Sequence, residues 1–211
     1  MEKRMTRPIR ALIDTYALEK NLSLLRAKSG NRFLWGVVKA NAYGHDDKAV
    51  CLKLQELGVK YYGVSNLWEG EKLRQHGITG TILTFGYTDE DYFDELLEYG
   101  ITQTAGSVQY AKQLSDYAVS KGVKLPVHIK VNTGMTRVGI DSQQEMLDIL
   151  DMPGLDCKAA YTHFAAADSL DSSDVEYTDR QQEKLMKIAK DKGLLIHSQN
   201  SGGIIYHGGF G

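Results

Sequence analysis

Lys39 is the residue of this chain whose position most favours chemistry. It ends the apolar run Phe33–Val38, which predicts a buried strand, and the loop Tyr43-Gly44-His45 follows closely. A charged amine is costly to bury, and burial lowers the pKa of a lysine. Because a neutral amine forms a Schiff base with an aldehyde, Lys39 is a candidate for holding an aldehyde cofactor. An isolated lysine here would more simply extend into solvent.

Lys130 and Arg137 are a second pair of candidate residues. Lys130 lies inside the apolar run Val127–Val131, where an amine needs a charged partner or a modification that changes its charge. Arg137 follows a turn at Gly134 and can present its planar guanidinium to a carboxylate or phenolate. Taken singly, the two residues are equally compatible with a salt-bridged strand lysine and a surface arginine.

Two further polar segments follow apolar runs. Tyr161 and His163 lie at the end of the run Cys157–Thr162, and a histidine there can move a proton or orient a charged group, although many such histidines are structural. The segment after the last predicted strand offers hydroxyl and backbone N–H groups that suit a phosphate. The simpler interpretation is a polar turn. That segment is His197-Ser198-Gln199-Asn200-Ser201-Gly202-Gly203.

Strands and helices alternate along the chain, which predicts parallel strands joined by right-handed crossovers. The predicted strands are 33–38, 61–64, 81–85, 101–104, 127–131, 157–162 and 194–197, and the helices are 47–57, 67–76, 90–99, 107–121, 142–150 and 174–192. A strand at 9–14 and a helix at 18–28 precede them. This spacing favours a TIM (β/α)8-type barrel over a doubly wound sheet, and both folds place their sites beyond the strand ends, where the candidate residues lie.

The four polar segments resemble motifs of the bacterial alanine racemase family, in the same order. Val37-Val38-Lys39-Ala40-Asn41-Ala42-Tyr43-Gly44-His45 is similar to the motif whose lysine holds pyridoxal 5′-phosphate (PLP). The segment from Lys130 to Arg137 resembles Lys-Val-Asp-Thr-Gly-Met-x-Arg, that from Tyr161 to Asp168 resembles Thr-His-Phe-Ala-x-Ala-Asp, and His197 to Ser201 resembles His-x-x-Asn-Ser. Asn132 replaces the family's aspartate, and Asp46 replaces a glycine.

The resemblance implies a role for each matching residue. Lys39 would bind PLP and act as acid or base on one face of the substrate, and a carbamylated Lys130 would position Arg137 at the cofactor oxygen and substrate carboxylate. His163 would neighbour the arginine that holds the pyridine nitrogen, with Tyr161 and His197 in support. The cofactor phosphate would contact Tyr43, Asn200 and Ser201.

The same resemblance predicts that residues 1–211 are the N-terminal barrel domain of such an enzyme. A barrel of seven strands keeps an open edge, so we expect the eighth strand and the family's C-terminal β domain to lie outside this sequence, together with the pyridine-nitrogen arginine. The family acts as a homodimer, and the partner's C-terminal domain would supply a tyrosine as the second base. We expect the 211-residue chain alone to be poorly active.

Composition excludes several other classes of protein. The net charge of −2 and the lack of a basic stripe argue against nucleic-acid binding, and no apolar run is long enough to cross a membrane. The two cysteines suggest no disulfide framework, as expected in the cytoplasm, and the six histidines show no metal-ligand spacing.

The predicted function is therefore PLP-dependent interconversion of L- and D-alanine, supplying peptidoglycan precursors. One alternative is a serine racemase of the vancomycin-resistance type, of which Gly86-Tyr87-Thr88 and Gln103-Thr104 are weakly reminiscent. Another is a non-catalytic PLP-binding barrel of the cofactor-homeostasis kind, which has a similar length and lysine. A third is a fragment that binds no cofactor.

Overall fold

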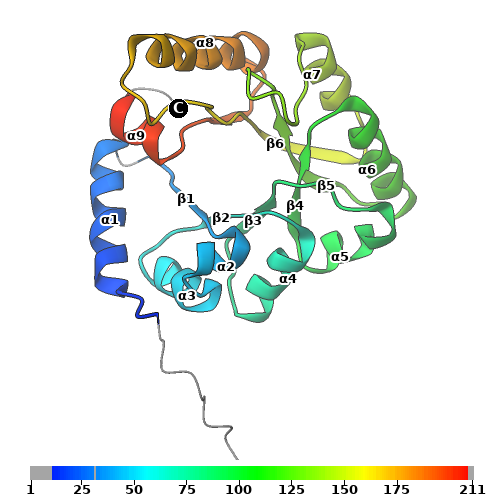
Figure 1. The fold of residues 1–211 in the computed structure, drawn as a ribbon. Helices are drawn as coiled ribbons and strands as arrows, with labels where there is room; N and C mark the ends of the chain where they lie inside the picture. The colour runs from blue at the N-terminus through cyan, green and yellow to red at the C-terminus, as the bar shows by residue number, and fades with distance from the viewer. Residues whose placement is uncertain (1–10, 31, 209–211) are drawn as a thin grey trace, which may run out of the picture.

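In the described residues, seven parallel strands form one curled sheet in the order in which they occur along the chain, with helices on its outer side (Figure 1). The computed structural model describes residues 11–30 and 32–208. The strands are β1 (Trp35–Val37), β2 (Tyr61–Val64), β3 (Thr81–Thr84), β4 (Ile101–Ala105), β5 (Leu125–Lys130), β6 (Leu155–Tyr161) and β7 (Leu195–His197). This is the arrangement of a TIM-type barrel without closure between β1 and β7 in the described residues, as the sequence predicts.

Helices connect the strands and cover the outer face of the sheet. They are α1 (Thr15–Lys28), α2 (Lys39–Gly44), α3 (Asp47–Glu56), α4 (Leu67–Gln75), the 3-10 helix η1 (Glu90–Tyr92), α5 (Phe93–Glu98), α6 (Val108–Ser120), α7 (Gln143–Leu150), α8 (Ser172–Ala189) and α9 (Ser201–Tyr206). Polar caps start several of them, and in α7 Ser142 and Glu145 form a reciprocal capping box. Gly58 ends α3 with a φ of +80°, the left-handed conformation that favours glycine after a helix.

Strand register brings the candidate residues together. Lys130 on β5 pairs with Tyr161 on β6, and Tyr161 pairs with His197 on β7. These residues are the last of their strands, so their side chains form a row along the carboxyl ends of the sheet. His128 lies two positions before Lys130 and therefore shares its face of β5.

Several details of the predicted elements are wrong, and helix α1 begins at Thr15 instead of residue 18. The described part of the expected strand 9–14, residues 11–14, is not a strand, because Asp14 caps α1 by accepting hydrogen bonds from the N–H groups of Tyr16 and Ala17; residues 9 and 10 lie outside the described residues. Helix α8 begins at Ser172, two residues before the predicted start. The polar segment after β7 is a helix from Ser201, not a turn.

The first and last helices of the described chain contact each other. Helix α1 contacts α9, blue and red in Figure 1. The core lies between the sheet and its helices and is built from fully buried side chains such as Tyr62, Ile101 and Leu114. In the part of the chain that the structure describes, no helix combines the length and apolar character needed to cross a bilayer.

Candidate active site

Lys39 opens a left-handed turn at the carboxyl end of β1. The four residues Ala40 to Tyr43 have φ between 52° and 55° and ψ between 37° and 50°, inside the segment named α2. Left-handed helical conformation costs L-residues roughly 1–2 kcal/mol each, so surrounding contacts must hold this turn. Lys39 is half-buried, and its Nζ lies 6.0 Å from the centre of the Tyr43 ring, whose side chain is exposed.

Side chains around the turn supply some of those contacts. The Asn41 Oδ1 atom accepts a hydrogen bond of 3.0 Å from the backbone N–H of Asp47, the first residue of α3. Asp46 has a φ of 67°, which explains why glycine is usual in its place, and its carboxylate caps α3 by accepting from Ala49 N–H at 2.9 Å. The helix cap offsets part of the backbone strain at Asp46.

Lys130 is buried and has no carboxylate partner among the described residues. Its Nζ donates only a long hydrogen bond of 3.4 Å, to the Val131 carbonyl, and lies 5.1 Å over the Tyr161 ring. Burial, reinforced by the positive charge of Arg137, lowers the pKa of Lys130 to about 7. A large share of this amine is therefore neutral and nucleophilic at neutral pH.

The loop that carries Arg137 is organised by Asn132. Its Oδ1 accepts hydrogen bonds from the N–H groups of Gly134 (3.3 Å) and Thr136 (2.9 Å), and its Nδ2 donates to Asp141 Oδ1 at 3.1 Å. An aspartate could accept the same two loop hydrogen bonds but could not donate the third. The change from the family's aspartate therefore keeps the loop's acceptor, and Arg137 remains exposed at its tip.

His163 lies within electrostatic reach of Lys130, Arg137 and Lys39. Partial burial, together with the positive charges of Lys130, Arg137 and Lys39, lowers the pKa of His163, whose ring still keeps an exposed edge. Among the described residues, no carboxylate forms an ion pair with any of the three cations. A neutral histidine within a concentration of positive charge makes this a site for an anion.

An aromatic stack lies beside the cations, in the barrel interior. The Trp35, His197 and Tyr161 rings stack in turn, with centroids 5.0 Å and 4.8 Å apart. His128 Nδ1 lies 3.0 Å from His197 Nε2. Thr104 donates to the Thr84 carbonyl, so the Tyr161 hydroxyl donates to Thr104 Oγ1 at 2.8 Å.

His128 and Trp35 were not among the candidates predicted from the sequence. His128 is two residues from Lys130, and strand alternation was a sufficient signal to place both on one face. Trp35 had no such signal, because its stacking on His197 depends on how far the sheet curls to bring β1 toward β7.

The segment after β7 presents polar groups at the start of a short helix. The Asn200 Oδ1 atom accepts from Gly203 N–H at 2.9 Å and thereby caps α9, and Ser201 is the first helical residue, with an exposed side chain. Asn200 is thus used in part by the protein itself, while the Ser201 hydroxyl remains accessible to a ligand.

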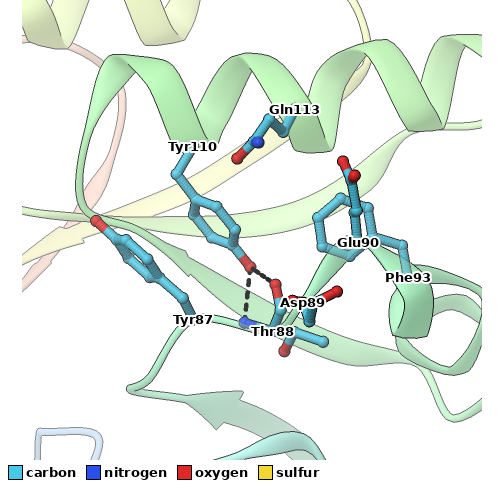
Figure 2. A pocket seen from close by; sticks show the side chains of 7 residues that line it. All are labelled: Tyr87, Thr88, Asp89, Glu90, Phe93, Tyr110 and Gln113. Carbon is cyan, nitrogen blue, oxygen red and sulfur yellow. Dashed lines mark hydrogen bonds between the residues drawn. The ribbon is translucent and has the colours of Figure 1, made fainter.

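A pocket lies outside this group of residues, between the segment after β3 and helix α6 (Figure 2). Its volume is about 440 Å³, and its lining residues are Tyr87, Thr88, Asp89, Glu90, Phe93, Tyr110 and Gln113. The Tyr110 hydroxyl accepts from Thr88 N–H (2.8 Å) and donates to the Thr88 carbonyl (2.9 Å), and burial raises its pKa. Because that hydroxyl is fully used within the protein, the pocket is a poorer candidate for chemistry than the cation cluster.

Comparisons with known proteins agree on one family. The family model described as "Alanine racemase, N-terminal domain" matches residues 13–210. An alanine racemase of Clostridium perfringens (strain SM101 / Type A) is 36% identical over 209 residues, covering 94% of this chain and 53% of that protein. An alanine racemase of Methanococcus maripaludis is 35% identical over 214 residues, covering 96% and 57%.

A solved structure shares the same fold. Alanine racemase of Clostridium difficile 630 in complex with cycloserine is 32% identical with a TM-score of 0.86, over 95% of this chain and 57% of that one. The chain spans about half the length of the curated relatives it matches. By sequence and by fold, this chain belongs to the alanine racemase family, and residues 13–210 match the model of the family's N-terminal domain.

Proposed function

We propose that this chain is the cofactor-binding part of a PLP-dependent racemase that interconverts L- and D-alanine. The observation that carries the proposal is the placement of Lys39, Lys130 and His163 at the carboxyl ends of β1, β5 and β6, with Arg137 on the loop after β5 and no carboxylate paired with these cations among the described residues. A phosphorylated cofactor and an amino-acid carboxylate bring the negative charge that such a site needs.

The residues of the site fit PLP by the chemistry of their donors. When bound, PLP delocalises the charge left by removal of the substrate's α-proton. Lys39 offers the amine that attaches the cofactor and that can then carry a proton at Nζ. Arg137 offers two parallel N–H donors for the substrate carboxylate or the cofactor's phenolic oxygen. Tyr43, Asn200 and Ser201 are the donors available to the phosphate.

His163 can orient the site without adding to its charge. Its lowered pKa keeps the ring neutral near pH 7, so one ring nitrogen donates and the other accepts. We propose that it orients a neighbouring arginine of the complete protein. Tyr161 and His197 stack on each other and line the site beside Lys130.

Lys130 is expected to carry a carbamate. With a pKa of about 7, its neutral amine can attack CO2, forming a nitrogen–carbon bond and releasing one proton. The resulting anion relieves the repulsion between Lys130 and Arg137 and can accept hydrogen bonds from the guanidinium. Protein equilibrated with ¹³C-bicarbonate should show a carbamate carbon resonance in NMR spectra. The resonance should disappear in K130M and persist in K158M, which changes an exposed lysine; its persistence in K130M would contradict the assignment.

The proposed function is tested by trapping the cofactor. Purified chain is mixed with PLP, reduced with borohydride, and digested, and the labelled peptide is identified by mass spectrometry. Label concentrated on Lys39 supports the proposal. Label spread evenly over exposed lysines such as Lys48 and Lys158, without enrichment at Lys39, would refute it for this chain.

The proposal also covers the compartment and the oligomeric state of the complete protein. We propose a cytoplasmic homodimer that supplies D-alanine for peptidoglycan, with the second base from the partner. The free thiols of Cys51 and Cys157 support a reducing compartment. Comparing turnover of L-alanine and L-serine by the complete protein would separate the proposed activity from the serine alternative.

A further inference from the structure

Glu69 links the start of the Lys39 turn to the end of the neighbouring strand. Its Oε1 accepts a hydrogen bond of 2.7 Å from the backbone N–H of Ala40, the residue directly after Lys39. Its Oε2 accepts from both the backbone N–H and the hydroxyl of Ser65, at 2.7 Å each. One carboxylate thus joins two chain segments that leave β1 and β2 side by side.

The geometry departs from that of an ordinary helix cap. Glu69 is the third residue of α4, and its N–H donates to Asn66 Oδ1 at 3.0 Å, as in half of a capping box. In the other half of a capping box, the Glu69 carboxylate would accept a hydrogen bond from the backbone N–H of Asn66. Here the carboxylate instead reaches Ser65 and the turn at Ala40, so its role extends beyond starting the helix.

The hydrogen bond from Ala40 N–H to Glu69 lies where the backbone leaves the strand and turns left-handed. The parallel ladder from β1 continues only to Val38, whose N–H donates to the Gly63 carbonyl at 2.8 Å. At Ala40 the chain turns left-handed, and its N–H is directed to Glu69. Ala40 is exposed, so water can replace Glu69 as a hydrogen-bond acceptor, but water cannot fix the direction of the peptide that follows Lys39.

We propose that Glu69 is the positioning residue for Lys39: it fixes the peptide after the lysine and so aims the amine into the site at the carboxyl ends of the strands. This rests on the proposed function insofar as the amine binds PLP. The hydrogen bond between Glu69 and the backbone of the turn does not depend on a cofactor and can be measured in its absence.

The test compares E69A and E69Q with two controls. E71Q changes a carboxylate on the same helix that accepts from Gln75, and S65A removes only the hydroxyl donor while leaving both backbone bonds. The E69Q amide has a single acceptor oxygen and cannot serve Ala40 and Ser65 through both of its terminal atoms. Amide hydrogen exchange at Ala40, borohydride trapping of PLP on Lys39 and urea unfolding are measured for each variant.

We expect exchange at Ala40 to accelerate about 10- to 100-fold in E69A, as expected for loss of a hydrogen bond to a charged group, and by a smaller factor in E69Q. Trapping on Lys39, relative to the other lysines, should fall about tenfold at limiting PLP, because a misdirected amine loses its orientation advantage. E71Q and S65A should match the wild type in both measurements.

The outcomes separate the two proposals. Wild-type exchange at Ala40 and wild-type trapping in both E69A and E69Q would overturn the role of Glu69. Faster amide exchange throughout the chain, together with a lower unfolding midpoint, would also overturn it in favour of a general structural role. Absence of Lys39 trapping in the wild type would refute the proposed cofactor site, whereas exchange at Ala40 would still decide whether Glu69 holds the turn.

Discussion

Replacing Lys39 by alanine is expected to lower racemase activity of the complete protein by about 10³- to 10⁴-fold, at the upper end of what one acid–base group contributes. The same change removes the amine that attaches PLP, so borohydride should leave no label at position 39. Arg137, Tyr43 and Ser201 would still offer donors to the cofactor, so weak, reversible binding should persist. Activity is measured by the appearance of D-alanine from L-alanine.

Two further variants separate covalent chemistry from charge. K39R keeps a cation in place but offers a guanidinium that does not lose its proton, so it should be as inactive as K39A. K48A removes an exposed lysine from α3 and should retain wild-type activity. Substantial activity in K39R would show that Lys39 serves only as a positive charge, and the proposed role of its amine would be wrong.

The strand ends that carry Lys39, Lys130, His163 and His197 could be predicted because their signals are local. Short apolar runs marked the strands, and parallel strands joined by helices place their carboxyl ends at one edge. Gly58 and similar glycines marked the helix ends. The seven strands and the helices predicted between them are confirmed in order, with errors of a few residues at their limits, whereas residues 11–14 form no strand and helices α2 and α9 were not predicted.

The shape of the turn after Lys39 could not be predicted in the same way. Ala40, Asn41 and Tyr43 have no glycine-like freedom, and a left-handed conformation is unfavourable for each of them taken alone. What selects it are contacts from elsewhere, including the N–H of Asp47 and the carboxylate of Glu69. Such contacts depend on the tertiary fold, so no local pattern in the sequence announces them.

A similar limit applied to the polar segment after β7. Asn200, Ser201 and two glycines suggested a turn, because these residues favour turns and are poor helix formers. In the structure Asn200 instead caps a single short helix that contacts α1. Packing against a distant element therefore outweighed local propensity.

Acid is expected to destabilise this protein through the His128–His197 pair. Burial lowers the pKa of His128 from its ordinary value of 6.5 to about 4, and burial, His128 and Lys130 lower that of His197. The 3.0 Å contact between the two rings needs one nitrogen to donate and the other to accept, which two protonated rings cannot do. The folded protein therefore favours both histidines in their neutral form.

The direction of the pH effect follows from proton binding. Between pH 6.5 and 4 the unfolded chain binds a proton at His128 that the folded protein does not bind, so stability falls as the pH falls. At about 1.4 kcal/mol per pH unit, His128 alone accounts for a loss of about 3 kcal/mol across that range. Well above pH 6.5 the histidine is neutral in both states and contributes no pH dependence.

Urea unfolding at a series of pH values measures this effect, and H128N isolates it. An asparagine amide can take the place of Nδ1 and keep a hydrogen bond to His197, but it does not titrate. The fall in unfolding free energy between pH 6.5 and 4 should be smaller in H128N than in the wild type by up to about 3 kcal/mol. H45N, which removes an exposed histidine from the loop after Tyr43, is the matched control and should keep the steeper fall.

Carboxylates also take up protons in this range, so only the difference between the two curves reports on His128. Equal losses in wild type and H128N would mean that the buried ring accepts a proton at little cost. A neighbouring group would then have to absorb the charge, although His197, which contacts the His128 ring, itself resists protonation. The difference between the two curves therefore measures the free-energy cost of protonating the buried ring of His128 in the folded protein.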